Sequence, residues 1–313
     1  MPRWLGVVLR LLGTAAGLAW IATHVELSKA TGALARIPMA TFALAALLVA
    51  ANVGVGALRW RVLLRAYGAT KIPPLGRLVY LYFVAFFYNN YLPGAVAGDV
   101  GRGVVTRDAF EGEGATGALA VVLVERALGL FALFALLALG LAITGSQIDS
   151  GTLWWWTMIG GAGSCALVAG IPASRRLARF LPGPLGRVAH KLPALHDTRA
   201  FVVAIVLSIG TQVFVALAGW VLLAALGPIG FLASLLVVPL AAATAFLPIT
   251  VGGAGAREAV YVALCVPMFG MAEGDAVAAS LGLWLAHLAV GAIGGVAQLA
   301  ARPPTPERVT PAS

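Results

Sequence analysis

The chain has 313 residues, of which 61% are hydrophobic and only 11% charged, far below the roughly 25% charged residues of soluble domains. This composition excludes a disordered chain and an ordinary soluble enzyme, which would need much more polar surface. The formal net charge is +9, but the basic residues stand between apolar runs. They therefore indicate orientation against an anionic membrane leaflet rather than binding to nucleic acid.

Nine apolar runs follow one another along the chain. They cover residues 5–23, 40–58, 78–92, 117–143, 153–171, 200–226, 231–247, 259–271 and 276–299. A bilayer-spanning helix needs about 20 apolar residues, so the runs predict an all-α, polytopic membrane protein with a single membrane domain at residues 1–300. Residues 301–313 contain four prolines and predict a disordered cytoplasmic tail. Arg3 before the first run also fits a cleaved signal peptide, although eight further runs favour an uncleaved first helix.

Basic residues are concentrated in two connecting segments. Residues 59–77 carry five basic side chains and no acidic one, and residues 172–199 carry six against one acidic residue, Asp197. Both segments are predicted to be cytoplasmic because basic loops are retained on that side. Residues 144–152, 227–230 and 272–275 contain no basic residue and are predicted to lie outside. The sequence thus predicts a multi-pass protein of the plasma (inner) membrane with both termini in the cytoplasm.

Three apolar runs separate the two basic segments, although segments on one side require an even number of crossings. The run at residues 78–92 has only 15 residues, or about 23 Å of helix against a hydrocarbon core of about 30 Å. It also ends in Asn89-Asn90 and Pro93-Gly94, so we expect a re-entrant element. Residues 231–247 and 259–271, separated by a Pro- and Gly-rich break, predict a second re-entrant element. Six full crossings remain.

The two breaks resemble each other at an offset of 155 residues. Residues 91–103 align without gaps to residues 246–258, and five of the 13 positions are identical. The same offset carries residues 117–143 onto the last run and residues 40–58 onto the start of the run at 200–226. The sequence therefore predicts pseudo-repeats at about residues 1–145 and 146–300. Each half has an odd number of crossings, so the second copy is inverted, as in many secondary transporters.

Only two charged side chains, Glu125 and Arg126, fall within a long uninterrupted apolar run. A charge at such depth costs at least ~2.5–3.5 kcal/mol and faces the protein interior. Adjacent helical residues point in different directions, so these two need not pair with each other. The predicted partners are Arg102 or Arg257 for Glu125, and Asp99 or Glu258 for Arg126.

Two interpretations of these charges remain open. They form either a lipid headgroup site or a structural ion-pair network that holds the re-entrant elements in place. We expect one interior cavity to contain the whole candidate headgroup-binding set. This set is Asp99, Arg102, Glu125, Arg126, Arg257 and Glu258.

Glycine and proline residues at the two breaks allow the backbone to turn sharply and to approach a ligand closely. A helix that begins after such a break points its free N–H groups and its positive dipole end into the cavity. With Arg102 and Arg257 nearby, these features predict an anion site, and a lipid phosphate is the natural anion in a membrane. The break residues are Pro93, Gly94, Gly98, Pro248, Gly252, Gly253 and Gly255.

The motifs resemble those of the flippase-like membrane domain of lysylphosphatidylglycerol synthases. The resemblance covers about residues 5–300. It rests on Arg59-Trp60-Arg61, Leu92-Pro93 with Gly98-Asp99 and Arg102, Glu125-Arg126 with Gly129, and Leu247-Pro248 with Gly252-Gly253, Gly255 and Arg257-Glu258. It implies a protein that moves phospholipids or polyprenyl-type lipids between leaflets. Only a short tail follows Leu299, where this family carries a transferase domain, so lysyl transfer is not expected.

We therefore expect a lipid flippase or scramblase rather than an enzyme. The four histidines lack metal-ligand spacing, and the sequence contains no CxxC, no P-loop motif and no Ser/His/Asp set. No metal and no cofactor is predicted. The expected partners are membrane lipids with anionic headgroups and a lipid-modifying enzyme, but no nucleic acid. The alternative is a membrane-embedded enzyme subunit, or a structural partner, in lipid or glycolipid synthesis.

Overall fold

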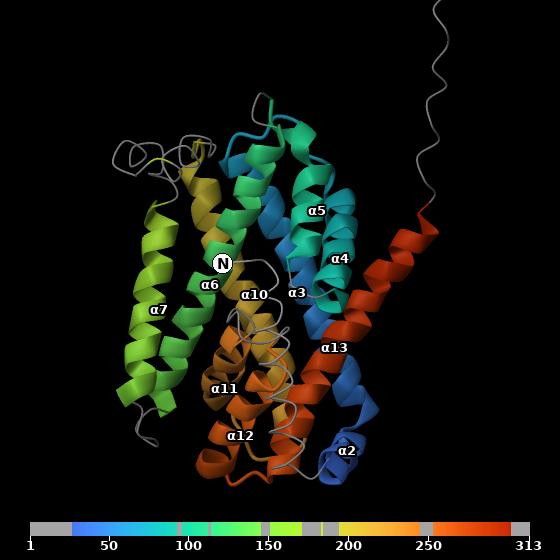
Figure 1. Ribbon diagram of the computed structural model, residues 1–313, viewed down its shortest axis with the longest axis vertical. Coiled ribbons are helices and arrows are strands. Elements are labelled where there is room, and N and C mark those ends of the chain that lie inside the picture. Colours follow the sequence, from blue (N-terminus) through green and yellow to red (C-terminus); the bar gives the residue numbers. More distant parts are fainter. Residues whose placement is uncertain are drawn as a thin grey trace, which may run out of the picture.

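The computed structural model describes residues 27–92, 96–111, 114–144, 151–170, 183, 194–244 and 253–301. Its elements are helices (Figure 1). In chain order they are α2 (Leu27–Arg36), α3 (Met39–Ala66), α4 (Leu75–Tyr91), α5 (Ala97–Val105), the short η1 (Arg107–Ala109), α6 (Gly114–Thr144), α7 (Gly151–Gly170), α10 (Thr198–Ala224), α11 (Phe231–Ala243), α12 (Ala256–Phe269) and α13 (Glu273–Ala300). Outside the described residues lie the apolar run at 5–23, Pro93, Gly94, Pro248, Gly252 and the tail at 302–313.

Four of the described helices, α3, α6, α10 and α13, are long and apolar enough to cross a membrane. Each has 27 to 31 residues. At 1.5 Å per residue they extend about 40–47 Å, more than the hydrocarbon core of about 30 Å. Helix α7, with 20 residues, covers most of the apolar run at residues 153–171 but is not among these four. These helices confirm the predicted all-α, polytopic membrane protein.

The first predicted re-entrant element is a hairpin of two short antiparallel helices, α4 and α5. Helix α4 begins directly after Pro74 and has 17 residues. Near the turn, the backbone N–H of Gly98 donates to the Asn89 side chain at 3.0 Å. A Cβ at Gly98 would overlap the carbonyl of Ala85, so only glycine permits this approach of the two helices. The chain therefore enters and returns on one side of the molecule (Figure 1).

The second hairpin consists of α11 and α12, which pack against each other. Figure 1 shows this pair in the opposite half of the molecule from α4 and α5. The turn into α12 places Gly253 and Gly255 at positive φ, 80° and 84°, where side chains other than glycine are strained. The Glu258 carboxylate accepts the Gly255 N–H at 2.8 Å and so caps the first turn of α12.

Helix packing repeats at the 155-residue offset, which carries α3–α6 onto segments that overlap α10–α13. Helix α4 packs against α13, and its counterpart α11 packs against α6. Both contacts use a glycine: a Cβ at Gly294 would overlap the carbonyl of Phe83, and a Cβ at Gly140 would lie 2.6 Å from the carbonyl carbon of Leu235. Helices α3 and α10, counterparts of each other, also pack together. Corresponding helices of the two halves therefore make corresponding packing contacts.

The connecting segments gather at two opposite ends of the molecule (Figure 1). At one end, the N–H of His196 donates to Ala66 O at 2.8 Å, and the N–H of Thr70 donates to Ala109 O at 3.0 Å. At this end, the hydrogen bond between His196 and Ala66 connects the two basic segments, residues 59–77 and 172–199, that are predicted to be cytoplasmic. At the other end, Arg36 of α2 forms an ion pair with Asp275 of α13.

One boundary predicted from the sequence is wrong. The apolar run at 40–58 was expected to end at a basic loop beginning with Arg59, but α3 continues to Ala66. Arg59 is therefore a helical residue, and only 7% of it is exposed. The interruption of the apolar run by Arg59 and Arg61 does not end the helix because arginine is itself a good helix former.

Candidate functional site

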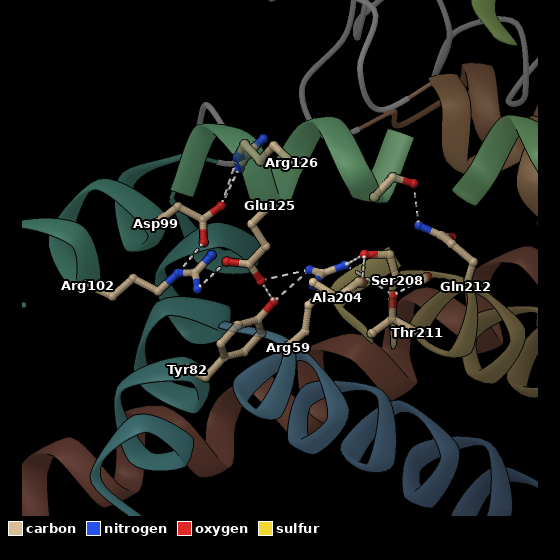
Figure 2. Close-up of polar contacts among 11 residues, drawn as sticks. Arg59, Tyr82, Asp99, Arg102, Glu125, Arg126, Ala204, Ser208, Thr211 and Gln212 are labelled. Carbon is tan, nitrogen blue, oxygen red and sulfur yellow. Dashed lines mark hydrogen bonds and ion pairs between the residues drawn. The ribbon is translucent and has the colours of Figure 1, made fainter. Parts of the chain in front are cut away.

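A cavity of about 240 Å³ lies between α3, α4, α5, α6 and α10, and we call it the first cavity. Its lining includes four of the six candidate residues: Asp99, Arg102, Glu125 and Arg126. Asp99 and Arg102 come from the first hairpin, and Glu125 and Arg126 come from the middle of α6. Figure 2 shows these side chains pointing toward one another.

Glu125 lies at the centre of the first cavity's ion network and is 1% exposed. Its Oε1 is 2.7 Å from Arg59 Nη2, and its Oε2 is 2.7 Å from Arg102 Nη1. The hydroxyl of Tyr82 donates to the same Oε1 at 2.7 Å. The three donors come from α3, α5 and α4 (Figure 2), so this one carboxylate joins three helices to α6.

Asp99 extends the network. Its Oδ1 accepts from Arg102 Nε at 2.9 Å, and its Oδ2 lies 2.7 Å from Arg126 Nη2. The predicted Glu125–Arg102 and Arg126–Asp99 pairs are therefore confirmed. With Arg59 included, three arginines and two carboxylates of the described residues line the first cavity.

Arg102 is also held by aromatic rings. Its guanidinium carbon lies 4.7 Å from the ring centroid of Trp60 and 4.5 Å from that of Tyr82. Trp60 is fully buried. Cation–π contacts of this kind contribute about 0.5–2 kcal/mol and fix the plane of the guanidinium.

Sequence reasoning did not identify Arg59 or the polar residues of α10 as site residues. Arg59 Nη1 donates to Ser208 Oγ and Thr211 Oγ1, both at 3.3 Å. Gln212 Nε2 donates to Gly129 O at 3.2 Å (Figure 2). The helical spacing of 208, 211 and 212 places these polar residues on one face of an otherwise apolar helix, which is the signal that could have revealed them.

Arg257 and Glu258 lie elsewhere, so the expectation of one shared cavity is wrong. Arg257 lines a second cavity of about 210 Å³ between α4, α10, α11, α12 and α13. Arg257 forms an ion pair with Glu258, and its Nε donates to Ser280 Oγ at 3.0 Å. Because α5 and α12 belong to different hairpins, their arginines reach different parts of the bundle.

The two sites nevertheless correspond at the 155-residue offset. Arg102 maps to Arg257, and Glu125 maps to Ser280. In the first cavity Arg102 contacts Glu125, and in the second Arg257 contacts Ser280. The second site therefore keeps the arginine, replaces its carboxylate partner by a hydroxyl, and takes its negative charge from Glu258 instead.

The glycines of the breaks have local backbone roles at the described positions. Gly98 allows the close approach of α4 and α5, and Gly253 and Gly255 occupy positive φ. One N–H group near the start of each short helix is already bonded within the protein: that of Gly98 to Asn89 and that of Gly255 to Glu258. Within the described residues, no group of three or more His, Cys, Asp or Glu side chains lies close enough to hold a metal ion.

Comparison with known proteins adds one finding. The family model described as the lysylphosphatidylglycerol synthase TM region matches residues 6–295. No curated protein matches the chain. The matched range contains both cavities and all described helices up to the last turn of α13. The chain therefore belongs to the family of lysylphosphatidylglycerol synthase transmembrane regions.

Proposed function

We propose that this protein moves a lipid with an anionic headgroup, a phospholipid or a polyprenyl-type phosphate, between the two leaflets of the membrane. The observation that carries the proposal is the cluster of five charged side chains at the first cavity, of which four are buried: Arg59, Asp99, Arg102 and Glu125. Arg59 and Arg102 are buried guanidinium groups in the lining of this cavity, and a phosphate is the kind of anion that such groups bind in bidentate geometry.

The network also offers a way to bind and release such a group. In the lipid-free state the carboxylates neutralise most of the arginine charge, which offsets part of the cost of burying it. An entering phosphate competes with Asp99 or Glu125 for an arginine, since guanidinium groups bind phosphate oxygens in bidentate geometry. The displaced carboxylate then takes up a proton or a cation, which couples ion movement to lipid movement.

The inverted repeat is part of the proposal. Two hairpins in opposite halves of the molecule give each leaflet its own broken-helix element, and related hairpins carry Arg102 and Arg257. In transporters of this layout, a substrate site near the membrane midplane opens alternately to the two sides. We propose the same here, with no covalent step assigned to this chain.

The test uses purified protein in liposomes that contain a fluorescent phosphatidylglycerol, with a quencher added outside. Wild-type protein is expected to make the inner-leaflet lipid accessible to the quencher. Arg102→Gln should abolish this movement, and Arg102→Lys should restore only part of it because lysine lacks the bidentate fork. The matched control is Arg107→Gln, since the Arg107 side chain is 64% exposed and lies outside both cavities.

Three outcomes would contradict the proposal. The first is wild-type protein that moves neither phosphatidylglycerol nor a polyprenyl phosphate. The second is a folded Arg102→Gln variant that moves lipid at the wild-type rate. The third is a new lipid product, seen by mass spectrometry when the protein is incubated with lipid extracts, which would favour the alternative of an enzyme subunit in lipid synthesis.

A further inference from the structure

The first cavity is lined by three uncharged amide side chains in addition to the ion network. They are Asn52 of α3, Asn89 of α4 and Gln212 of α10, and we call them the amide cluster. Asn52 lies seven residues before Arg59, and Asn89 lies seven residues after Tyr82. At 1.5 Å per residue, each asparagine is about 10 Å along its helix from the ion network. One cavity therefore has a charged part and an amide part.

All members of the amide cluster lie on the same side of the ion network. Helices α3 and α4 are joined at the predicted cytoplasmic end and run in opposite directions, so Asn52 and Asn89 are both farther from that end than the ion network is. Gln212 Nε2 donates to Gly129 O at 3.2 Å, one helical turn beyond Glu125 on α6. The amide cluster is thus the deeper part of the cavity, toward the middle of the spanning helices.

Each amide keeps hydrogen-bonding capacity for a ligand. The Asn52 side chain makes no hydrogen bond within the described residues, although it lies in the middle of an apolar helix. Asn89 uses its side-chain oxygen for the N–H of Gly98, which leaves its Nδ2 available, and the bond to Gly129 leaves Gln212 Oε1 available. A polar side chain without a partner is costly in a spanning helix, so these atoms mark a place where a polar ligand group is stabilising.

A hydroxyl group is the ligand that suits the amide cluster, because hydroxyl and amide groups each donate and accept hydrogen bonds. An ammonium group would need a carboxylate beside it. The carboxylates of the described lining, Asp99 and Glu125, belong to the charged part and already pair with arginines. A bare phosphate would occupy the arginines and leave the amides without partners.

We propose that the amide cluster binds an uncharged, hydroxyl-bearing unit attached to the lipid phosphate, a glycerol or a sugar. The protein then moves lipids with polyol phosphate headgroups in preference to lipids whose headgroup ends in a cation. This inference rests on the proposed function and specifies its substrate class. The phosphate binds at Arg59 and Arg102, and the hydroxyl groups extend from it toward the amide cluster.

The test removes one amide without removing a hydrogen bond of the protein. Asn52→Leu keeps a branched side chain and should lower the rate of phosphatidylglycerol movement in liposomes about tenfold, the loss expected when hydrogen bonds to the headgroup disappear. Movement of phosphatidic acid, which lacks the glycerol unit, should not change. The matched control is Gln298→Leu, which removes an amide of α13 outside the first cavity and should alter neither rate.

The wild-type protein supplies the second comparison. It should move phosphatidylglycerol at least about tenfold faster than phosphatidylethanolamine, whose headgroup ends in an ammonium group. Equal wild-type rates for these two lipids would overturn the proposal. So would a folded Asn52→Leu variant that slows phosphatidylglycerol and phosphatidic acid equally, or that slows neither.

A further measurement leaves the amide cluster unchanged. In a background with Cys165→Ser and Cys265→Ala, Gly129→Cys places a thiol beside the cluster, where a Cβ would have only Arg59 Nη1 within 4 Å among the described residues. A small water-soluble thiol reagent should label this cysteine. Glycerol phosphate or glucose phosphate should protect it at a concentration at least about tenfold below that of inorganic phosphate, because only the polyol phosphates reach the amides. The better protectant identifies the unit as glycerol or sugar.

The matched control is Gly32→Cys, at an exposed position of α2, where labelling should occur without protection. Failure of Gly129→Cys to react, or equal protection by inorganic phosphate, would contradict the proposal.

The two proposals fail differently. If polyol phosphates protect position 129 better than inorganic phosphate does, but no lipid moves, the specificity of the amide cluster stands and the transport function is wrong. If phosphatidylglycerol and phosphatidylethanolamine move at the same rate, transport stands and the specificity is wrong.

Discussion

Glu125 contributes to both the stability and the proposed chemistry of the first cavity. Its carboxylate forms ion pairs with Arg59 and Arg102 and accepts a hydrogen bond from the Tyr82 hydroxyl. Removing the charge of Glu125 therefore leaves both arginines without their main counter-ion. Arg126 is different, because its side chain, which pairs with Asp99, is 31% exposed. An ion pair of Glu125 therefore contributes more to the free energy of unfolding than the ion pair of Arg126 does.

We therefore predict that Glu125→Gln lowers the free energy of unfolding by about 3–5 kcal/mol, the usual cost of leaving a buried ion without its partner. Arg126→Gln should cost about 1 kcal/mol or less, since solvent screens a partly exposed pair. Thermal unfolding of both variants in the same detergent measures the difference. Equal destabilisation by the two substitutions would contradict the central position assigned to Glu125.

Tyr82 combines two interactions that can be separated. Its hydroxyl donates to Glu125, and its ring lies against the guanidinium of Arg102. Tyr82→Phe removes only the hydroxyl and should cost about 1.5–3 kcal/mol, as expected for a hydrogen bond to a charged group. Tyr82→Leu should cost more, because it also removes the cation–π contact. Unfolding measurements on the pair test this order, and a Leu variant as stable as the Phe variant would show that the ring contact contributes nothing.

At the scale of elements, the first hairpin depends on one close approach. Gly98 and Ala85 bring the backbones of α5 and α4 into contact, and this contact sets the position from which Asp99 and Arg102 reach the cavity. Gly101 lies on the same helix, but a Cβ there would have nothing within 4 Å. The two glycines therefore form a matched pair within one helix.

We predict opposite effects of alanine at these two positions. Gly98→Ala should separate α4 from α5, destabilise the protein and abolish lipid movement, because its Cβ overlaps the Ala85 carbonyl. Gly101→Ala should be neutral or stabilising by up to about 1 kcal/mol, since alanine favours the helix more than glycine does. Unfolding temperature and the liposome assay together check the prediction. A Gly98→Ala variant with wild-type stability would mean that the hairpin does not require this contact.

Much of this architecture was predictable from the sequence, and the exceptions have physical reasons. The short run at 78–92 and its Asn- and Pro-rich end predicted the first hairpin. The charges inside residues 117–143 predicted that Glu125 pairs with an arginine and Arg126 with a carboxylate of that hairpin. Arg59 was missed because a charge at the edge of an apolar run looks like a loop residue. Whether it is solvated or buried depends on Ser208 and Thr211 of α10, more than a hundred residues away. The separation of Arg257 from Arg102 depends likewise on how the two hairpins pack, which local sequence does not encode.

At the scale of the whole molecule, charge is distributed unequally between the two ends of the bundle. The described residues at the end near Ala66 include six basic residues and three acidic ones. These are Arg61, Arg65, Lys71, Arg77, Arg107, Arg199, Asp108, Glu111 and Asp197. The opposite end has two basic residues, Lys29 and Arg36 of α2, against two acidic ones, Glu273 and Asp275 of α13. Because basic segments are retained in the cytoplasm, this asymmetry predicts which end faces inward.

We predict that Lys71 lies on the cytoplasmic side of the plasma membrane and Glu273 on the outer side. Lys71 is 70% exposed by side chain, and Glu273 is exposed in the first turn of α13, so a cysteine at either position is accessible to a reagent from its own side. In the Cys165→Ser, Cys265→Ala background, a membrane-impermeant maleimide applied to intact cells should label Glu273→Cys but not Lys71→Cys. Permeabilised cells should show labelling of both, which controls for folding and reagent access. If intact cells label Lys71→Cys but not Glu273→Cys, the protein has the opposite orientation in the membrane, and the fold described above still holds. Labelling of both positions from outside would place the two ends on one side, which is incompatible with α3 and α13 as spanning helices.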